Sequence, residues 1–194
     1  METQKNVYLL ETRLPVKHVI NKITVPLKLV LLSLTVGLSA IVLASDDHIA
    51  PEEFLAKVFT TSLPPSNTVW ITGEKKEATE NILGHKPGFL RIRYWGDSAR
   101  SAWIVDEIGK TEPITIGVVL NDSEIEEVKV LAFRESRGWE IKHEFFTRQF
   151  KGASIEKNHR LNRSIDGISG ATLSVKAVTN VSRLVLYLAQ FVSS

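Results

Sequence analysis

Residues 113–133 read PITIGVVLNDSEIEEVKVLAF, and this stretch is the strongest indication of the fold. Two segments rich in β-branched residues flank Asn121, Asp122 and Ser123, which are residue types typical of tight turns. Such a pattern predicts two antiparallel strands joined as a hairpin. We therefore expect an antiparallel sheet at the centre of the chain.

Segments on both sides of this hairpin extend the pattern. Alternating apolar and polar residues bounded by turn residues predict strands at 68–72, 89–95 and 101–109. A proline or acidic residues in the first turn, or a glycine at the end, predict helices at 50–59 and 74–84. After residue 173, Val178, Val181, Val185 and Leu188 recur at helical spacing, as in an amphipathic helix that packs on a sheet. We expect one α+β domain with a mostly antiparallel sheet and packed helices.

Composition excludes several classes of function. The 194 residues include no cysteine, so disulfides, thiolate metal sites and cysteine nucleophiles are excluded. Five of the 24 basic residues lie in the first 28 positions, and residues 29–194 hold 19 basic and 20 acidic side chains. This balance argues against nucleic-acid binding. The five histidines lack metal-binding spacing, so we expect surface or structural roles for them.

An uncharged run, LVLLSLTVGLSAIVLA, occupies residues 29–44 and follows a basic leader. We interpret residues 1–24 as a cytoplasmic leader and 25–44 as a single-pass transmembrane helix, with a cleaved signal peptide as the alternative. Basic residues before the run and acidic ones after it favour a bacterial inner-membrane protein with a periplasmic C-terminal domain. That domain divides into an N-terminal part, 45–111, and residues 112–194.

Residues 166–174 read DGISGATLS directly before the last predicted helix. From the residue types alone, Ser169 or Thr172 caps the helix, and Gly167 and Gly170 supply loop conformations. The stretch contains neither of the serine-hydrolase motifs G-x-S-x-G and S-x-x-K, so it does not predict a hydrolase nucleophile.

The same stretch resembles the flavinylation motif of the FMN-binding domain family, which includes the FMN-carrying subunits of the Rnf and sodium-pumping NADH:quinone reductase complexes. The family pattern is Asp, two residues, then Ser/Thr-Gly-Ala-Thr, and Asp166, Ser169, Gly170, Ala171 and Thr172 match it in full. The resemblance implies that a Mg-dependent flavin transferase takes FMN from FAD and joins it to the Thr172 hydroxyl as a phosphoester.

The resemblance covers about residues 112–190. The segment LAFRESRGWEI places Glu135, Ser136 and Gly138 in the order of the family's Glu-Thr-x-Gly loop, with Ser in place of Thr. Trp139 is the tryptophan best placed to stack on the flavin; for Trp70, Trp95 and Trp103 core packing is the expectation. The segment FFTRQFKG resembles the family's aromatic Gln-Phe-x-Gly segment. Three cations are candidates for contact with phosphate or reduced flavin: Arg134 and Arg137 in the loop, and Lys176 in the last predicted helix.

These observations predict a membrane-anchored periplasmic flavoprotein that relays electrons between donor and acceptor proteins, rather than a stand-alone enzyme. One alternative is a flavin-dependent small-molecule reductase, for which residues 93–110 have to build a substrate pocket. A second alternative is a non-redox interaction domain with a capped helix at SGAT. Asp106 and Glu107 are expected to flank a solvated turn.

Overall fold

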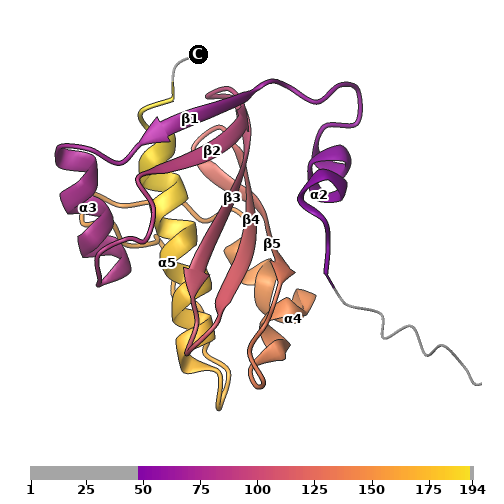
Figure 1. The fold of residues 1–194 in the computed structure, drawn as a ribbon, viewed down its shortest axis with the longest axis vertical. Coiled ribbons are helices and arrows are strands. Elements are labelled where there is room, and N and C mark those ends of the chain that lie inside the picture. The colour runs from indigo at the N-terminus through magenta and orange to yellow at the C-terminus, as the bar shows by residue number, and fades with distance from the viewer. Residues whose placement is uncertain (1–47, 193–194) are drawn as a thin grey trace, which may run out of the picture. The chain divides into compact units, whose positions relative to one another are not determined.

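The computed structural model describes residues 48–192, which form an α+β fold (Figure 1). Five strands form one antiparallel sheet in the order β1-β2-β3-β4-β5, so the expected α+β class and antiparallel sheet are confirmed. The elements are α2 (Pro51–Val58), β1 (Ser66–Trp70), α3 (Glu74–Leu83), β2 (Arg91–Gly96), β3 (Arg100–Ile108), β4 (Pro113–Asn121), β5 (Glu124–Ala132), the 3-10 helix η1 (Trp139–Lys142), α4 (Glu144–Thr147), the 3-10 helix η2 (Arg148–Phe150) and α5 (Thr172–Ala189).

The predicted leader and transmembrane segment lie outside the described residues. Within residues 48–192, no helix is both long and apolar enough to span a bilayer. The predicted division at residue 112 falls in the turn between β3 and β4, which pair over nine residues of one continuous sheet.

Local sequence explains most of the element boundaries. Helix α3 ends because Gly84 adopts the left-handed conformation at φ 82°, which glycine enters without steric cost. The β4–β5 hairpin turns at Asp122, whose φ is 52° and whose residue type tolerates that region. The predicted hairpin and the predicted helix ending at Gly84 are both present.

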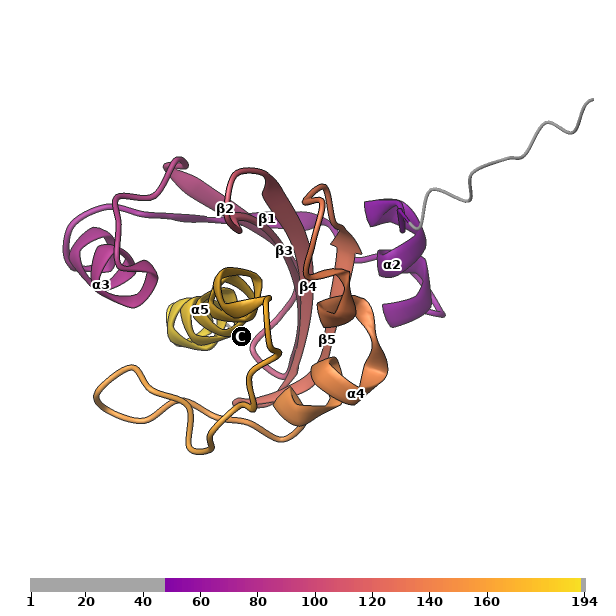
Figure 2. The same cartoon turned by 90° about the horizontal axis from the view of Figure 1, so that it is seen from below.

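Helix α5 forms the centre of the core. Figure 2 shows it lying in the concave face of the curved sheet, with α3 beside it and α2 on the opposite face of the sheet. The four residues of the predicted stripe, Val178, Val181, Val185 and Leu188, are fully buried. They meet Trp103 of β3, which is also fully buried and stacks on Tyr94 with ring centroids 4.7 Å apart.

Helix α2 covers the other face of the sheet through a close contact with Gly117 of β4. A Cβ atom at position 117 would come within 2.7 Å of the Phe54 ring, so the absence of a side chain lets the helix approach. Trp95 is buried beside α2, as expected. Trp70 departs from the expected core role: it is 53 % exposed on edge strand β1, where Arg91 lies over its ring.

Strands β2 and β3 pair over only three residues. Their ladder joins Tyr94, Trp95 and Gly96 to residues 101–103 and then stops, although β2 continues to Arg91 in register with β1. The two strands diverge beyond this point, and the sheet opens into a fork.

The close contact at Gly117 predicts that Gly117→Ala is destabilising. The added methyl group must displace the Phe54 ring, so we expect the free energy of unfolding to fall by about 1–3 kcal/mol. Gly88→Ala is the matched control because a Cβ there meets no atom within 4 Å. Urea unfolding followed by circular dichroism measures both; equal stability of Gly117→Ala and the wild type would show that α2 is free to move away from the sheet.

Candidate functional site

The residues of the DGISGATLS motif, 166–174, lie where the chain enters α5. Gly170 adopts φ 83°, Ala171 occupies the N-cap position, and Thr172 is the first helical residue. A Cβ at Gly170 would meet no atom within 4 Å, so the space over the loop is open. The chain therefore presents Thr172, which is exposed, at the first turn of an 18-residue helix.

The expectation that Ser169 or Thr172 caps this helix is wrong. The N-cap is Ala171, and no side chain accepts a hydrogen bond from the first turn. The first backbone bond of the helix runs from the Val175 N–H to the Ala171 carbonyl at 2.9 Å.

As a result, the backbone N–H groups of Thr172, Leu173 and Ser174 have no acceptor among residues 48–192, and the Thr172 hydroxyl also lacks a partner there. Free N–H groups and the helix dipole favour a negative charge at this end of a helix.

The loop 133–138 packs against this helix start. Gly138, at φ 91°, lies so close to α5 that a Cβ would stand 3.1 Å from both the Ala171 Cβ and the Ser174 Oγ. The two segments that carry the family resemblance, separated by about thirty residues in the chain, are thus brought into contact. Small residues at positions 138 and 171 are what this contact requires.

Glu135 of the same loop binds the turn between β3 and β4. Its Oε1 accepts hydrogen bonds from the backbone N–H groups of Lys110, Thr111 and Glu112 at 2.5, 2.6 and 3.0 Å, and its Oε2 accepts one from the Thr111 hydroxyl at 3.0 Å. These bonds stabilise the carboxylate and lower the pKa of Glu135 to about 2. In the structure, Glu135 therefore joins the loop 133–138 to the β3–β4 turn.

The remaining predicted site residues lie around this contact. Trp139 is 53 % exposed and meets the edge of the His143 ring, with centroids 4.9 Å apart. Ser136, Asp166 and Ser169 are exposed. The Asp166 N–H donates to Gln149 Oε1 at 2.7 Å, so the Gln-Phe-x-Gly segment holds the start of the motif.

The three candidate cations take different positions. Arg134 donates from Nη1 to the Pro113 carbonyl at 3.0 Å and to the Thr115 hydroxyl at 3.1 Å, which holds it at the start of β4. Arg137 is exposed. Lys176 lies one turn after Thr172, and its Nζ reaches the chain at Gly84, where a built Cβ would be 3.8 Å away.

Residues 109–186 match the model of the FMN-binding domain family. This region is an FMN-binding domain. The match spans the β3–β4 turn, the loop 133–138, which contacts both that turn and the start of α5, and most of α5 itself. It supports a flavoprotein over the non-redox alternative. No curated protein matches the chain.

The residues around Thr172 fit the phosphate group of FMN. An open loop at Gly170, unpaired N–H groups in the first helical turn and an exposed hydroxyl suit an anion better than an apolar group. Trp139 offers an exposed aromatic face on the adjoining loop.

One part of the structure corrects the sequence-based interpretation. Asp106 and Glu107 lie in β3 rather than at a solvated turn, and the Glu107 side chain is only 5 % exposed. Its Oε1 lies 2.6 Å from His85 Nε2. The alternation of strand residues in WIVDEI could have predicted the burial of Glu107, because it places Glu107 on the same face as Trp103 and Val105.

The lowered pKa of Glu135 predicts a specific dependence of stability on pH. The carboxylate contributes stability fully above its unfolded pKa of about 4.3, and this contribution is lost as pH falls toward about 2. We expect Glu135→Gln to unfold at lower temperature than the wild type at neutral pH, with the difference shrinking over this acid range. Glu127→Gln, at an exposed position on β5, is the control. A difference that stays constant with pH, measured by thermal unfolding, contradicts the assignment.

Proposed function

We propose that this chain is a membrane-anchored periplasmic flavoprotein that carries FMN covalently on Thr172 and relays electrons between redox partners. The observation that carries the proposal is the exposed Thr172 hydroxyl at an uncapped helix N-terminus, within the FMN-binding domain. FMN attached at this hydroxyl would form a phosphodiester, which would place one negative charge beside unpaired N–H donors.

Attachment requires a separate flavin transferase acting on FAD: the Thr172 oxygen forms a P–O bond to the FMN phosphate, the pyrophosphate bond of FAD breaks, and AMP and the hydroxyl proton are released. A threonine hydroxyl is a weak nucleophile that needs a neighbouring base, and no group among residues 48–192 hydrogen-bonds to the Thr172 hydroxyl. The exposure of Thr172 and the open space at Gly170 leave this hydroxyl accessible to another protein.

Bound FMN supplies one- and two-electron chemistry, and the residues of the chain position it. The first turn of α5 would hold the phosphate, while Gly138 keeps the 133–138 loop against that turn and Glu135 binds the β3–β4 turn. The exposed ring of Trp139 would be available to stack with the flavin. Because this surface is open, a donor or acceptor protein can approach the cofactor directly.

A flavin-dependent small-molecule reductase is the second candidate function. The observation that favours it is a cleft of about 730 Å³ at the fork between β2 and β3. Seven of the residues that line this cleft come from the 93–110 segment: Arg93, Trp95, Ile104, Val105, Asp106, Glu107 and Ile108.

The attachment site is tested by coexpression with and without a flavin transferase. We expect a fluorescent band on a denaturing gel only with the transferase, and no band for Thr172→Ala, because the acceptor oxygen is then absent. Thr179→Ala, on the same helix, is the matched control and should fluoresce like the wild type. A fluorescent band for Thr172→Ala would rule out Thr172 as the attachment site. A wild-type band without fluorescence in the presence of the transferase would rule out covalent attachment of flavin to this chain.

The membrane topology is tested by fusing alkaline phosphatase after Ser194. The basic leader predicts an exported C-terminus, so the fusion should be enzymatically active in a bacterial host, whereas a C-terminal fluorescent protein that matures only in the cytoplasm should stay dark. The reverse pattern contradicts a periplasmic domain. The mass of the purified chain then separates a retained anchor from a cleaved signal peptide.

A further inference from the structure

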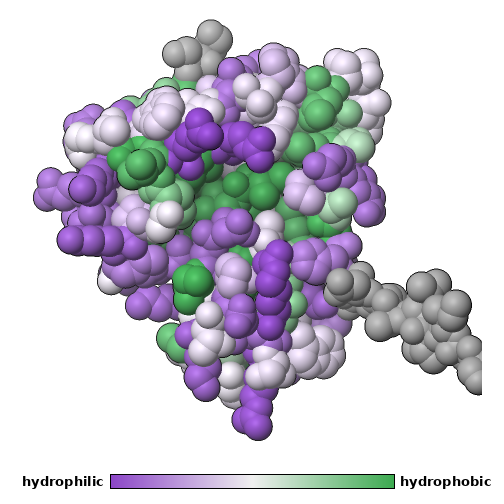
Figure 3. Space-filling model, viewed as in Figure 1, coloured by the Kyte–Doolittle hydropathy of each residue, from purple (hydrophilic) through white to green (hydrophobic). Residues whose placement is uncertain are grey.

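The fork between β2 and β3 opens into a cleft lined by both apolar and charged side chains. Its apolar lining comes from α2, the segment before β2, and the two strands, and comprises Leu55, Phe89, Ile92, Trp95, Ile104, Val105 and Ile108. Figure 3 shows hydrophobic surface at the middle of this side of the molecule, bordered by hydrophilic residues. The volume of about 730 Å³ lies within the range of small-molecule sites.

The fork also leaves peptide groups of both strands without a strand partner. In a strand, the N–H and C=O groups of one residue point to the neighbouring strand on one side, and those of the next residue point to the other side. Gly109 faces β4, because its N–H bonds to the Glu112 carbonyl at 3.0 Å across the β3–β4 turn. The N–H and C=O groups of Ile108, and of Asp106 two residues earlier, therefore point toward β2. Since the β2–β3 ladder ends at the pair Tyr94–Trp103, these groups face the cleft.

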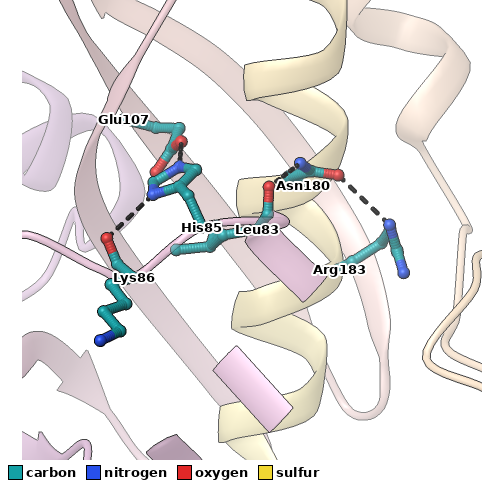
Figure 4. Close-up of polar contacts among 6 residues, drawn as sticks. All are labelled: Leu83, His85, Lys86, Glu107, Asn180 and Arg183. Carbon is teal, nitrogen blue, oxygen red and sulfur yellow. Dashed lines mark hydrogen bonds and ion pairs between the residues drawn. The ribbon is translucent and has the colours of Figure 1, made fainter. Parts of the chain in front are cut away.

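His85 and Glu107 line one wall of the cleft. Figure 4 shows the direct contact between their side chains and the contact of His85 with Lys86. His85 Nδ1 lies 2.9 Å from the Lys86 carbonyl, which only accepts hydrogen bonds, so Nδ1 carries a hydrogen. The 2.6 Å contact between Nε2 and Glu107 Oε1 then needs a second proton, on either the nitrogen or the oxygen. The pair is electrically neutral while it holds this proton and carries one negative charge after losing it.

The surroundings help the pair to keep its proton. Hydrogen bonds to the Lys86 carbonyl and to Glu107 raise the pKa of His85, and burial raises the pKa of Glu107. Lys176 of α5 acts against this and lowers both pKa values through its charge. The other charged residues that line the cleft are Glu52 of α2, Arg91 and Arg93 of β2, Asp106 of β3, and Arg134 after β5.

We infer that this cleft binds a small, mostly apolar molecule that carries a carbonyl-type oxygen, with the His85–Glu107 pair as one wall. The apolar side chains of the lining contact the body of the molecule, and the unpaired strand N–H groups donate to its oxygen. A negatively charged pair repels that oxygen, so binding requires the shared proton. The lining contains none of residues 135–139 or 166–172 and shares only Arg134 with the candidate flavin contacts. Under the reductase alternative the cleft is the substrate site, but ligand binding itself does not depend on flavin.

The test measures binding of menadione to the full chain expressed without a transferase, by calorimetry. Menadione is flat and apolar with two carbonyl oxygens, and the chain has no cysteine to react with it. We expect saturable binding that is about fivefold tighter than that of 2-methylnaphthalene, which lacks the oxygens. Absence of saturable binding, or equal affinity for both compounds, would overturn the inference.

Two substitutions at one position locate the site. Gly88 lines the cleft, and a Cβ there meets no atom within 4 Å, so a side chain is accommodated without displacing the chain. Gly88→Phe fills the cleft and should abolish binding, whereas Gly88→Ala should bind like the wild type. Unchanged binding by Gly88→Phe would place the ligand elsewhere and contradict the proposal.

The role of the His85–Glu107 pair is tested by measuring the affinity for menadione as a function of pH. Menadione does not titrate, so wild-type affinity should fall as pH rises and the pair loses its proton. The double variant His85→Gln/Glu107→Gln removes both titrating groups and should show a flat profile. His48→Gln, an exposed histidine outside the cleft, should keep the wild-type profile. A profile unchanged by the double substitution would refute the role of the pair. Failure of any of these tests leaves the gel fluorescence at Thr172 unaffected, so the two proposals fail separately.

Discussion

Burial of one face of α5 in the concave side of the sheet is the interaction on which the rest of the structure depends. The apolar stripe of this helix is fully buried against β3 and β4 and against α3, and each large side chain moved out of water contributes about 1.5–3 kcal/mol. Because the stripe fixes the axial position and rotation of the helix, it also fixes the position of the first turn. Thr172 is therefore presented to solvent by the same packing that forms the core.

Two short-range contacts then organise the loops around that first turn. Gly138 has no side chain, which lets the 133–138 loop reach Ala171 and Ser174. Glu135, three residues earlier, accepts the N–H groups of the β3–β4 turn. One loop thus connects the helix start to the sheet. Loops that position a cofactor need such support, since the cofactor contributes the chemistry and the chain controls its position.

The fork in the sheet shows a different balance of forces. Ending the β2–β3 ladder after three residue pairs leaves peptide groups without a strand partner, so this part of the sheet lacks the hydrogen bonds that stabilise a longer ladder. The same region holds a nearly buried carboxyl group, Glu107, with a histidine as its partner. Core packing alone would favour a longer ladder and an apolar residue at this position. Both departures occur at one cleft, and together they are the reason why we propose a ligand site there.

Sequence by itself determined the α+β class, the hairpin of β4 and β5, the buried stripe of α5 and the match of residues 166–172 to the flavinylation motif. These features depend on residues close together in the chain, where periodicity and turn chemistry act. Tertiary structure decided the contact of Gly138 with Ala171, the binding of the β3–β4 turn by Glu135, and the pairing of His85 with Glu107. It also showed that no side chain caps α5 and that Trp70 is exposed at the sheet edge. These depend on which segments distant in sequence become neighbours, and no local pattern encodes the point at which two paired strands diverge.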